Sequence, residues 1–429
     1  MYKYLIAFVL SMPLIGIWLV EHGEYAMSVG VPGEANGATE AFAIFVAAVV
    51  LVALASGGRY RLRRRQNASV ATSNPALLNY RDRECVHFAK NLLLLTLAFL
   101  LMMLFAFGGI NVWLGTIEKG LFRATLGPFG ALAYLMTKFA IPALFAYATL
   151  LFAKSTRSRQ VRALWLANAA MVFITGSTWG FKTTGVFMLL PGLLILNWIM
   201  SAKRLVTFCA VFIGTLMLFF FWFDAQLMED VNVVPFLATR LTVLQGDVAW
   251  YVYGLYAAGE TLPNYWPTVI AAAGDTVLSI LGVSKENHVE WMKYHYDWMI
   301  THLAGVPLEN IANGHSITAT PFAEGIVAGG WWGAMLFAVL AGLLVGRTYY
   351  HLDRAIKTGF DATAAILSTY FCFQIFSWLN GGAITQLFHV SVLVYLMATY
   401  ALLRAMRLKP RKRTSARQDR NPGTSPQPV

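Results

Sequence analysis

Long apolar runs alternate with short polar segments along most of the 429-residue chain. The runs are about 15–25 residues long, which is close to what an α-helix needs to cross a hydrocarbon core of about 30 Å. The pattern therefore predicts an all-α polytopic membrane protein with about ten transmembrane helices. The predicted spans are Tyr4–Val20, Ala41–Ser56, Leu92–Ile110, Phe129–Ala153, Ala163–Trp179, Val186–Met200, Leu205–Phe223, Gly325–Val345, Ala362–Leu379 and Leu387–Leu403.

The spacing of the runs divides the chain into four parts. Residues 1–223 hold about seven spans, and residues 321–403 hold about three. Between them, residues 224–320 form a connection that is too long to be a simple link and contains many aromatic residues, so we expect it to be functional. Residues 404–429 are polar, basic and proline-containing, and the composition predicts a disordered tail.

Composition and charge support this topology and fix its orientation. The chain is 58% hydrophobic and 13% charged, whereas soluble domains have roughly 25% charged residues. With the N-terminus inside, 26 of the 33 Lys and Arg residues fall on the cytoplasmic side and 16 of the 21 acids fall outside. This is the positive-inside pattern, and it predicts that both termini are cytoplasmic.

The net charge of +12 does not indicate a nucleic-acid partner. Basic stretches such as Arg61–Arg65 lack the interleaved aromatic residues of a nucleic-acid surface. We expect these stretches to contact anionic membrane lipid instead, and we expect no nucleic acid to bind.

Three basic residues outside the cytoplasmic clusters are candidates for substrate binding. Lys138 lies about 13 Å from the outer end of its span, where a charge is costly unless it faces a cavity or a partner. Lys182 lies in the glycine-rich break Gly176–Gly185, beside two threonines, and could hold a phosphate or simply snorkel to the interface. Arg240 lies in the stretch TRLTVLQGDVAW (Thr239–Trp250) and could hold a diphosphate, or pair with Asp247 or Glu229.

The densest polar constellation closes the long outer connection, in the stretch NGHSITATPFAEGIVAGGWWG. His315 has a side chain suited to accepting a proton from a sugar hydroxyl, and Glu324 could orient it or act itself. Both residues are therefore catalytic candidates. Gly325, Gly329 and Gly333 follow at four-residue spacing, which predicts one small-residue helix face open to close packing.

A metal site and a cofactor are not expected. His288, His295 and His302 repeat every seven residues, but helical rise separates neighbours by about 10.5 Å, too far for one zinc ion. Together with Trp291 and Trp298, they predict an amphipathic helix at the membrane surface.

The stretches at Arg240–Trp250 and His315–Gly333, the many spans and the late large loop together resemble the O-antigen polymerase and ligase superfamily of bacterial inner membranes. The resemblance covers the middle and C-terminal two-thirds of the chain. It implies a GT-C-like architecture, inner-membrane localisation, a periplasmic loop at 224–320, and metal-independent glycosyl transfer from undecaprenyl-diphosphate-linked glycans.

By this resemblance, Arg240 holds the donor diphosphate and His315 activates the acceptor hydroxyl. Lys182 stands where family members often carry Arg, and it cannot make the bidentate contact of a guanidinium. The expected function is polymerisation of lipid-linked repeat units into O-antigen or a related surface polysaccharide. Expected partners are the lipid-linked donor and acceptor, membrane lipids and a chain-length regulator protein.

Two other functions remain open at this point. An O-antigen ligase would transfer finished glycan to the lipid A core, and the sequence hardly separates it from a polymerase. A transporter or flippase of lipid-linked oligosaccharide would show two related halves, which this chain lacks. An acyltransferase centred on His389 is disfavoured, because a lone intramembrane histidine is more often a satisfied bundle residue.

Overall fold

A computed structural model describes most of the chain. The described residues are 2–67, 82–114, 116–117, 122–123, 125–155, 158–179, 182–196, 238–260, 262, 298–305, 307 and 317–406. Within these ranges the chain is helical apart from turns and short connections, and two isolated β-bridges are the only extended pairings. The predicted all-α class is confirmed for this part of the chain.

The described helical residues form α-helices and single π-helical turns. The α-helices are α1 (Tyr2–Glu21), α2 (Ala38–Asn67), α3 (Asp82–Leu101), α4 (Ile110–Trp113), α6 (Phe129–Leu135), α7 (Ile141–Lys154), α8 (Arg159–Trp179), α9 (Lys182–Leu196), α12 (Val243–Ala257), α17 (Pro321–Thr358), α18 (Asp361–Tyr370), α19 (Phe376–Gly381), α20 (Thr385–Phe388) and α21 (Val390–Met406). The π-helical turns are η1 (Met102–Ala106), η2 (Met136–Ala140), η3 (Met299–Leu303) and η4 (Phe371–Ile375).

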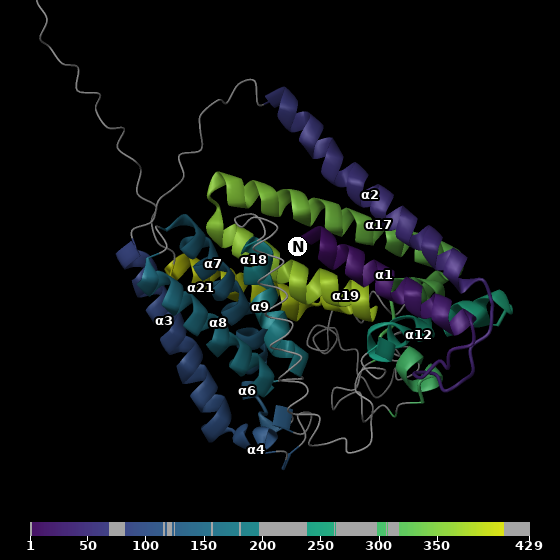
Figure 1. The fold of residues 1–429 in the computed structure, drawn as a ribbon, viewed down its shortest axis with the longest axis horizontal. Coiled ribbons are helices and arrows are strands. Elements are labelled where there is room, and N and C mark those ends of the chain that lie inside the picture. Colours follow the sequence, from purple (N-terminus) through teal and green to yellow (C-terminus); the bar gives the residue numbers. More distant parts are fainter. Residues whose placement is uncertain are drawn as a thin grey trace, which may run out of the picture.

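The helices form two groups that meet at one central helix (Figure 1). Helices α3, α6, α7 and α8 gather on one side, and α1, α2, α12 and α17 lie on the other. The continuous helix made of α18, η4 and α19 packs on α7 and α9 from the first group and on α1 and α17 from the second. We call the Gly381 end of this helix its outer end, after the orientation that the sequence predicts, and residues from both groups can meet there.

Six helices in the described part are long and apolar enough to cross a membrane, and each overlaps a predicted span. They are Tyr4–Glu21, Ala38–Gly57, Asp82–Ala106, Phe129–Lys154, Pro321–Thr358 and Asp361–Gly381. Two shorter apolar helices, Thr184–Leu196 and Val390–Met406, coincide with two more predicted spans. The predicted span Leu205–Phe223 lies outside the described residues.

Large apolar side chains face outward along these helices. Leu51, Leu94, Leu336 and Met397 lie on four different helices and are between 63% and 67% exposed. A soluble protein rarely leaves so many large apolar groups in water, whereas a bilayer solvates them well. The chain is therefore a membrane-embedded protein.

Glycines allow the closest helix contacts in the second group. A Cβ atom added to Gly346 of α17 would lie 2.6 Å from the Ala53 carbonyl oxygen of α2, and one added to Gly342 would lie 2.7 Å from that of Val49. Gly246 of α12 faces α1 in the same way, because its Cβ would lie 2.5 Å from the Pro13 carbonyl oxygen. Such small residues let helices pack backbone to backbone in a membrane.

Helix α17 contains a sharp reversal that the sequence pattern did not predict. Gly330 has φ of +61°, which glycine adopts without strain, and Gly329 is also non-helical. A Cβ added to Gly325 would lie 2.6 Å from the Ala334 Cα atom, so the segment before the reversal packs against the segment after it. The expectation that Gly325, Gly329 and Gly333 form one continuous helix face is therefore wrong: they form the tip of a helical hairpin, which we call the outer hairpin (321–334).

A buried ion pair joins the first group to the central helix at the opposite end of that helix. Lys154 Nζ, in the last turn of α7, lies 2.5 Å from Asp361 Oδ1, in the first turn of α18. The side chains are 13% and 3% exposed. Each charge also complements the dipole of its own helix end.

Asp361→Asn is expected to lower the free energy of unfolding by about 2 kcal/mol, because the change leaves the Lys154 ammonium without its carboxylate in a buried site. Unfolding in mixed detergent and sodium dodecyl sulfate micelles measures the change. The exposed pair Lys357–Asp353 provides the control, since its side chains are 51% and 21% exposed. Asp353→Asn should cost less than about 1 kcal/mol, and equal losses at both sites would contradict the assignment.

Candidate functional site

The outer end of the central helix is a break in the helical backbone. Gly382 closes α19 in the left-handed region, with φ of +84°, and residues 382–389 then lead through α20 to α21. The Ala319 amide donates to the Gly381 carbonyl oxygen at 3.2 Å, so the segment before the outer hairpin pairs with this break. The break segment (382–389) thus lies between the outer hairpin and α21.

Glu324 attaches the outer hairpin to the break segment. Its side chain is fully buried in the first turn of α17, where Thr320 accepts the Ala323 amide as the helix cap. Glu324 Oε2 accepts the Trp378 indole N–H at 2.8 Å, and Oε1 accepts the Ile384 amide at 2.7 Å. The carboxylate therefore holds two separate chain segments in register, one on each side of Gly382.

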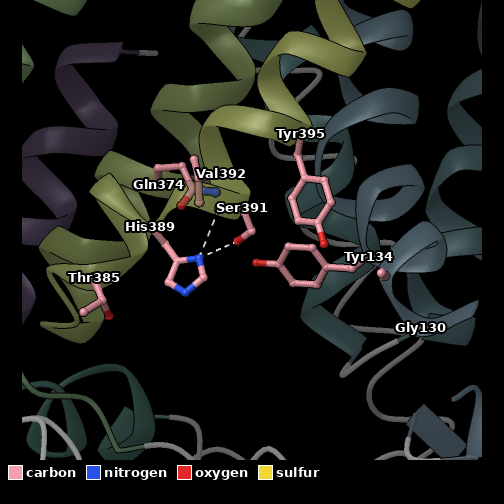
Figure 2. Close-up of a pocket in the computed structure, with 9 residues that line it drawn as sticks. Gly130, Tyr134, Gln374, Thr385, His389, Ser391, Val392 and Tyr395 are labelled. Atoms are coloured by element: carbon pink, nitrogen blue, oxygen red, sulfur yellow. Dashed lines mark hydrogen bonds between the residues drawn. The ribbon is translucent and has the colours of Figure 1, made fainter. Parts of the chain in front are cut away.

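A pocket of about 420 Å³ opens on the other side of the break segment, and we call it the outer pocket. Figure 2 shows Tyr134 from α6 pointing toward His389, with Tyr395 from α21 beside it. Its volume is within the range of small-ligand sites, and its lining combines aromatic with polar side chains. The lining residues are Gly130, Ala131, Tyr134, Gln374, Thr385, His389, Ser391, Val392 and Tyr395.

His389 and Ser391 are the polar pair in this pocket. His389 Nδ1 lies 2.6 Å from Ser391 Oγ and accepts the Ser391 amide at 3.2 Å (Figure 2). Because Nδ1 is an acceptor, Nε2 is the nitrogen that carries the proton in neutral His389. The contact also caps the start of α21, so a local structural role accounts for the geometry of this pair.

Two π-helical turns border the pocket. One is η4, which carries the buried Gln374 of the pocket lining. The other is η2, which carries Lys138, and Lys138 Nζ lies 5.4 Å from the ring centre of Phe373. Single π-helical turns within α-helices are frequent at functional sites. The prediction that Lys138 does not face lipid agrees with this position, because its ammonium lies against the central helix.

Arg123 brings a second positive charge to this region. Its charge interacts with that of Lys138, and its guanidinium lies 5.9 Å from the ring centre of Trp179 and donates to the Trp179 carbonyl oxygen at 3.3 Å. Burial lowers the pKa of Arg123, yet arginine starts so high that the group stays cationic at neutral pH. Trp179 ends α8, and α9 begins three residues later at Lys182. Arg123 and Lys138 are therefore close enough for their charges to interact, and Lys138 lies four residues after Tyr134 of the outer pocket.

The other predicted site residues are distributed differently. Lys182 is the first residue of α9, and its side chain is outside the described part. Arg240 lies in the turn before α12, which packs on α1, α2 and α17, whereas η2 with Lys138 packs on α6, α7, α8 and α21. Of the proposed ion-pair partners of Arg240, Asp247 accepts the amides of Ser28 and Val248, and Glu229 lies outside the described residues. His315 also lies outside them.

Three residues of this region were not site candidates from the sequence. Arg123 was counted only as an outer charge, although its position shortly before an apolar run could have marked it. Trp378 and Gln374 lie inside an apolar run, and no local pattern distinguishes them from core residues. The helix predicted at 288–302 is described only from Trp298, where the Trp298 and His302 rings stack with centres 5.3 Å apart.

Within the described ranges, no group of three or more His, Cys, Asp or Glu side chains could hold a metal ion. Comparison of the chain with protein-family models, with curated proteins and with solved structures gives no match. The function therefore has to be argued from the chemistry of the site.

Proposed function

We propose that the protein polymerises lipid-diphosphate-linked oligosaccharide repeat units into a surface polysaccharide at the outer face of a bacterial inner membrane. The observation that carries the proposal is the pair of interacting cations, Lys138 and Arg123, in the helix group that also carries Tyr134 of the outer pocket. Charge inside a membrane protein is costly and is typically retained for function.

The cations suit a diphosphate leaving group. When a sugar transfers from a lipid diphosphate, the bond between its anomeric carbon and a phosphate oxygen breaks, and negative charge develops on that oxygen. Fixed positive charges that face this oxygen lower the barrier. In the proposal, Lys138 and Arg123 supply this stabilisation, with the N-terminus of α9 and Lys182 as further anion-binding groups.

The acceptor hydroxyl attacks the anomeric carbon and loses its proton to a base. His315 is proposed as this base, and Glu324 is the second candidate from the sequence. The two hydrogen bonds to Glu324 support a positioning role, because they fix Ile384 next to Thr385 of the outer pocket. The resemblance assigns Arg240 to the donor diphosphate. Its turn belongs to the other helix group, so a contact with the diphosphate of the second lipid-linked substrate is the alternative.

The proposal includes the remaining topology. It places both termini in the cytoplasm and about ten spans in a GT-C-like arrangement, with residues 224–320 on the periplasmic side. The excess of cytoplasmic Lys and Arg supports the orientation. A chain-length regulator is the expected protein partner.

A lipid-linked oligosaccharide transporter is the second candidate function. The backbone break at residues 382–389 favours it, because discontinuous helices beside a polar pocket are common in transporters. A ligase that acts on the lipid A core would use the same chemistry as a polymerase and differs only in its acceptor.

Purified protein in vesicles with a short lipid-diphosphate-linked glycan tests the function. A polymerase converts the single repeat unit into a ladder of longer chains and releases lipid diphosphate. The expected result is a ladder on a gel without added nucleotide sugar.

Two other outcomes would identify a different function. Movement of intact substrate between leaflets without chain growth would overturn the polymerase proposal in favour of transport. Transfer of glycan only when lipid A core is added would identify a ligase. As a residue-level test, Arg240→Ala should slow chain growth at least tenfold, whereas Glu260→Ala, an exposed residue of the same segment, should leave it unchanged.

A further inference from the structure

A second cavity lies in the second helix group, away from the outer hairpin. It is formed where the start of α1 meets α2 and α17. It has a volume of about 370 Å³, and its lining is almost entirely apolar. We call it the inner groove. It is lined by Tyr2, Ile6, Val49, Val50, Ala53, Leu54, Gly57, Val345, Gly346 and Tyr349.

Contacts between the helices hold the walls of the inner groove together on two sides. The Tyr2 hydroxyl donates to the Val345 carbonyl oxygen at 2.6 Å, and its ring lies 5.0 Å from that of Tyr349. These contacts hold the start of α1 against α17, and Gly346 packs α17 on α2. On the third side, Val50 is 40% and Leu54 is 67% exposed. Since these two residues lie on a membrane-spanning helix, the groove opens sideways toward lipid.

Basic residues begin at this same level on all three helices. Lys3 directly follows Tyr2, Arg59 lies two residues after Gly57, and Arg347 directly follows Gly346. Arg347 is exposed. Helix α2 also continues to Asn67 and carries four further arginines in that stretch. In three separate chain segments, basic residues therefore follow the lining residues at this end of the groove.

We propose that the inner groove binds one anionic phospholipid, with an acyl chain in the cavity and the phosphate headgroup at the end of the groove where basic residues follow its lining residues in the chain. The cavity supplies an apolar surface open to the bilayer, and the basic residues supply the complement to the headgroup charge. The nearby acid Asp353 does not oppose this, because Lys357 neutralises it in an ion pair at 2.7 Å. A peptide would leave its backbone groups without partners against so apolar a lining.

The proposal does not depend on the proposed function, because the inner groove and the outer pocket are lined by different helices. It differs from general attraction of basic residues to a membrane surface, since it predicts a saturable site with one lipid per chain. Occupancy would tie α1, α2 and α17 together at the end where the chain begins.

Titration of purified full-length protein in dodecyl maltoside with phosphatidylglycerol tests the site, with thermal unfolding and native mass spectrometry as readouts. One retained phosphatidylglycerol and a rise in melting temperature are expected, and phosphatidylcholine should produce neither. The triple variant K3Q/R59Q/R347Q should raise the half-saturating lipid concentration by about 100-fold, since each basic residue near an anionic headgroup contributes about fivefold.

Two kinds of variant separate a site from surface charge. R411Q/K412Q/R413Q removes the same charge from the tail and should bind lipid like the wild type. Gly57→Leu and Val50→Trp fill the cavity while keeping every charge, and both should abolish the retained lipid; Val50 is partly exposed, so its variant should fold. Equal weakening by the tail variant, or unchanged binding by a folded cavity-filling variant, overturns the proposal.

Discussion

Glu324→Ala is expected to lower the free energy of unfolding by about 4 kcal/mol. The change leaves two buried donors, the Trp378 indole N–H and the Ile384 amide, without an acceptor, and each costs about 1–3 kcal/mol. It also leaves a cavity where a fully buried side chain stood. Because the outer hairpin and the break segment are joined through this carboxylate, both should become accessible to hydrogen exchange. Unfolding in mixed micelles, with exchange followed by mass spectrometry, measures both effects.

Glu324→Gln separates positioning from proton transfer. The amide keeps one oxygen acceptor and turns the other into a donor, so a loss of about 1–2 kcal/mol is expected. If Glu324 only positions Ile384, chain growth by folded Gln variant should stay within about tenfold of wild type. If Glu324 takes the acceptor proton, chain growth should collapse although the protein folds. Unchanged stability of Glu324→Ala would show that the two hydrogen bonds do not hold the segments together.

Lys138→Met is expected to slow chain growth by about 100–1,000-fold, which is the loss typical when one group that stabilises developing negative charge is removed. Methionine keeps the length of the apolar stem beside Phe373 but removes the ammonium. Stability should not fall, because the like charge of Arg123 no longer has a neighbour to repel. Chain growth in vesicles, with the substrate in excess, isolates the effect on the chemical step.

Two matched control variants test whether the effect comes from the charge of Lys138. Lys138→Arg keeps the charge and should retain chain growth within about tenfold of the wild type. Lys357→Met removes a lysine at the other end of the helices and should have no effect. If Lys138→Met extends chains at the wild-type rate, Lys138 takes no part in the reaction and the proposed function loses its main support.

The C-terminal ends of two membrane-spanning helices could be read from the sequence to within one residue. The run predicted at Phe129–Ala153 lies within the helical stretch Phe129–Lys154, and the one predicted at Tyr4–Val20 lies within Tyr4–Glu21. Both end at a charged residue, because moving a charge into hydrocarbon costs more than any local helix preference can offset. The predicted and observed ends agree to within one residue because this cost decides where the helix leaves the membrane.

The reversal in α17 could not be predicted in the same way. Glycines four residues apart are typical both of a helix face and of a hairpin tip, and only contact with the rest of the protein decides between them. Here Gly325 meets Ala334, and Tyr256 of α12 packs against Gly330, where an added Cβ would lie 3.0 Å from its ring. A hydropathy profile shows only one apolar stretch from residue 321 onward.

The candidate site was predicted in part. The cost of a charge in a span singled out Lys138, and its position beside the central helix agrees with that argument. The partners of Glu324 were not predictable, since Trp378 and Ile384 are 54 and 60 residues away in the sequence. Arg123 was missed because its neighbour Trp179 is also distant, and only packing brings the two together.

The contact between α1 and α12 also has a consequence for synthesis. The Ser28 amide donates to Asp247 Oδ2 across 219 residues of chain, and Gly246 lies against α1 nearby. At about 5–20 residues per second, a ribosome needs roughly 10–40 s to make the intervening chain. During that time, the face of α1 that packs on α12 is uncovered in the membrane. Chaperones, proteases or a second nascent chain can bind to it. Substitutions at this contact should therefore reduce the yield of protein before they change anything that the finished molecule does.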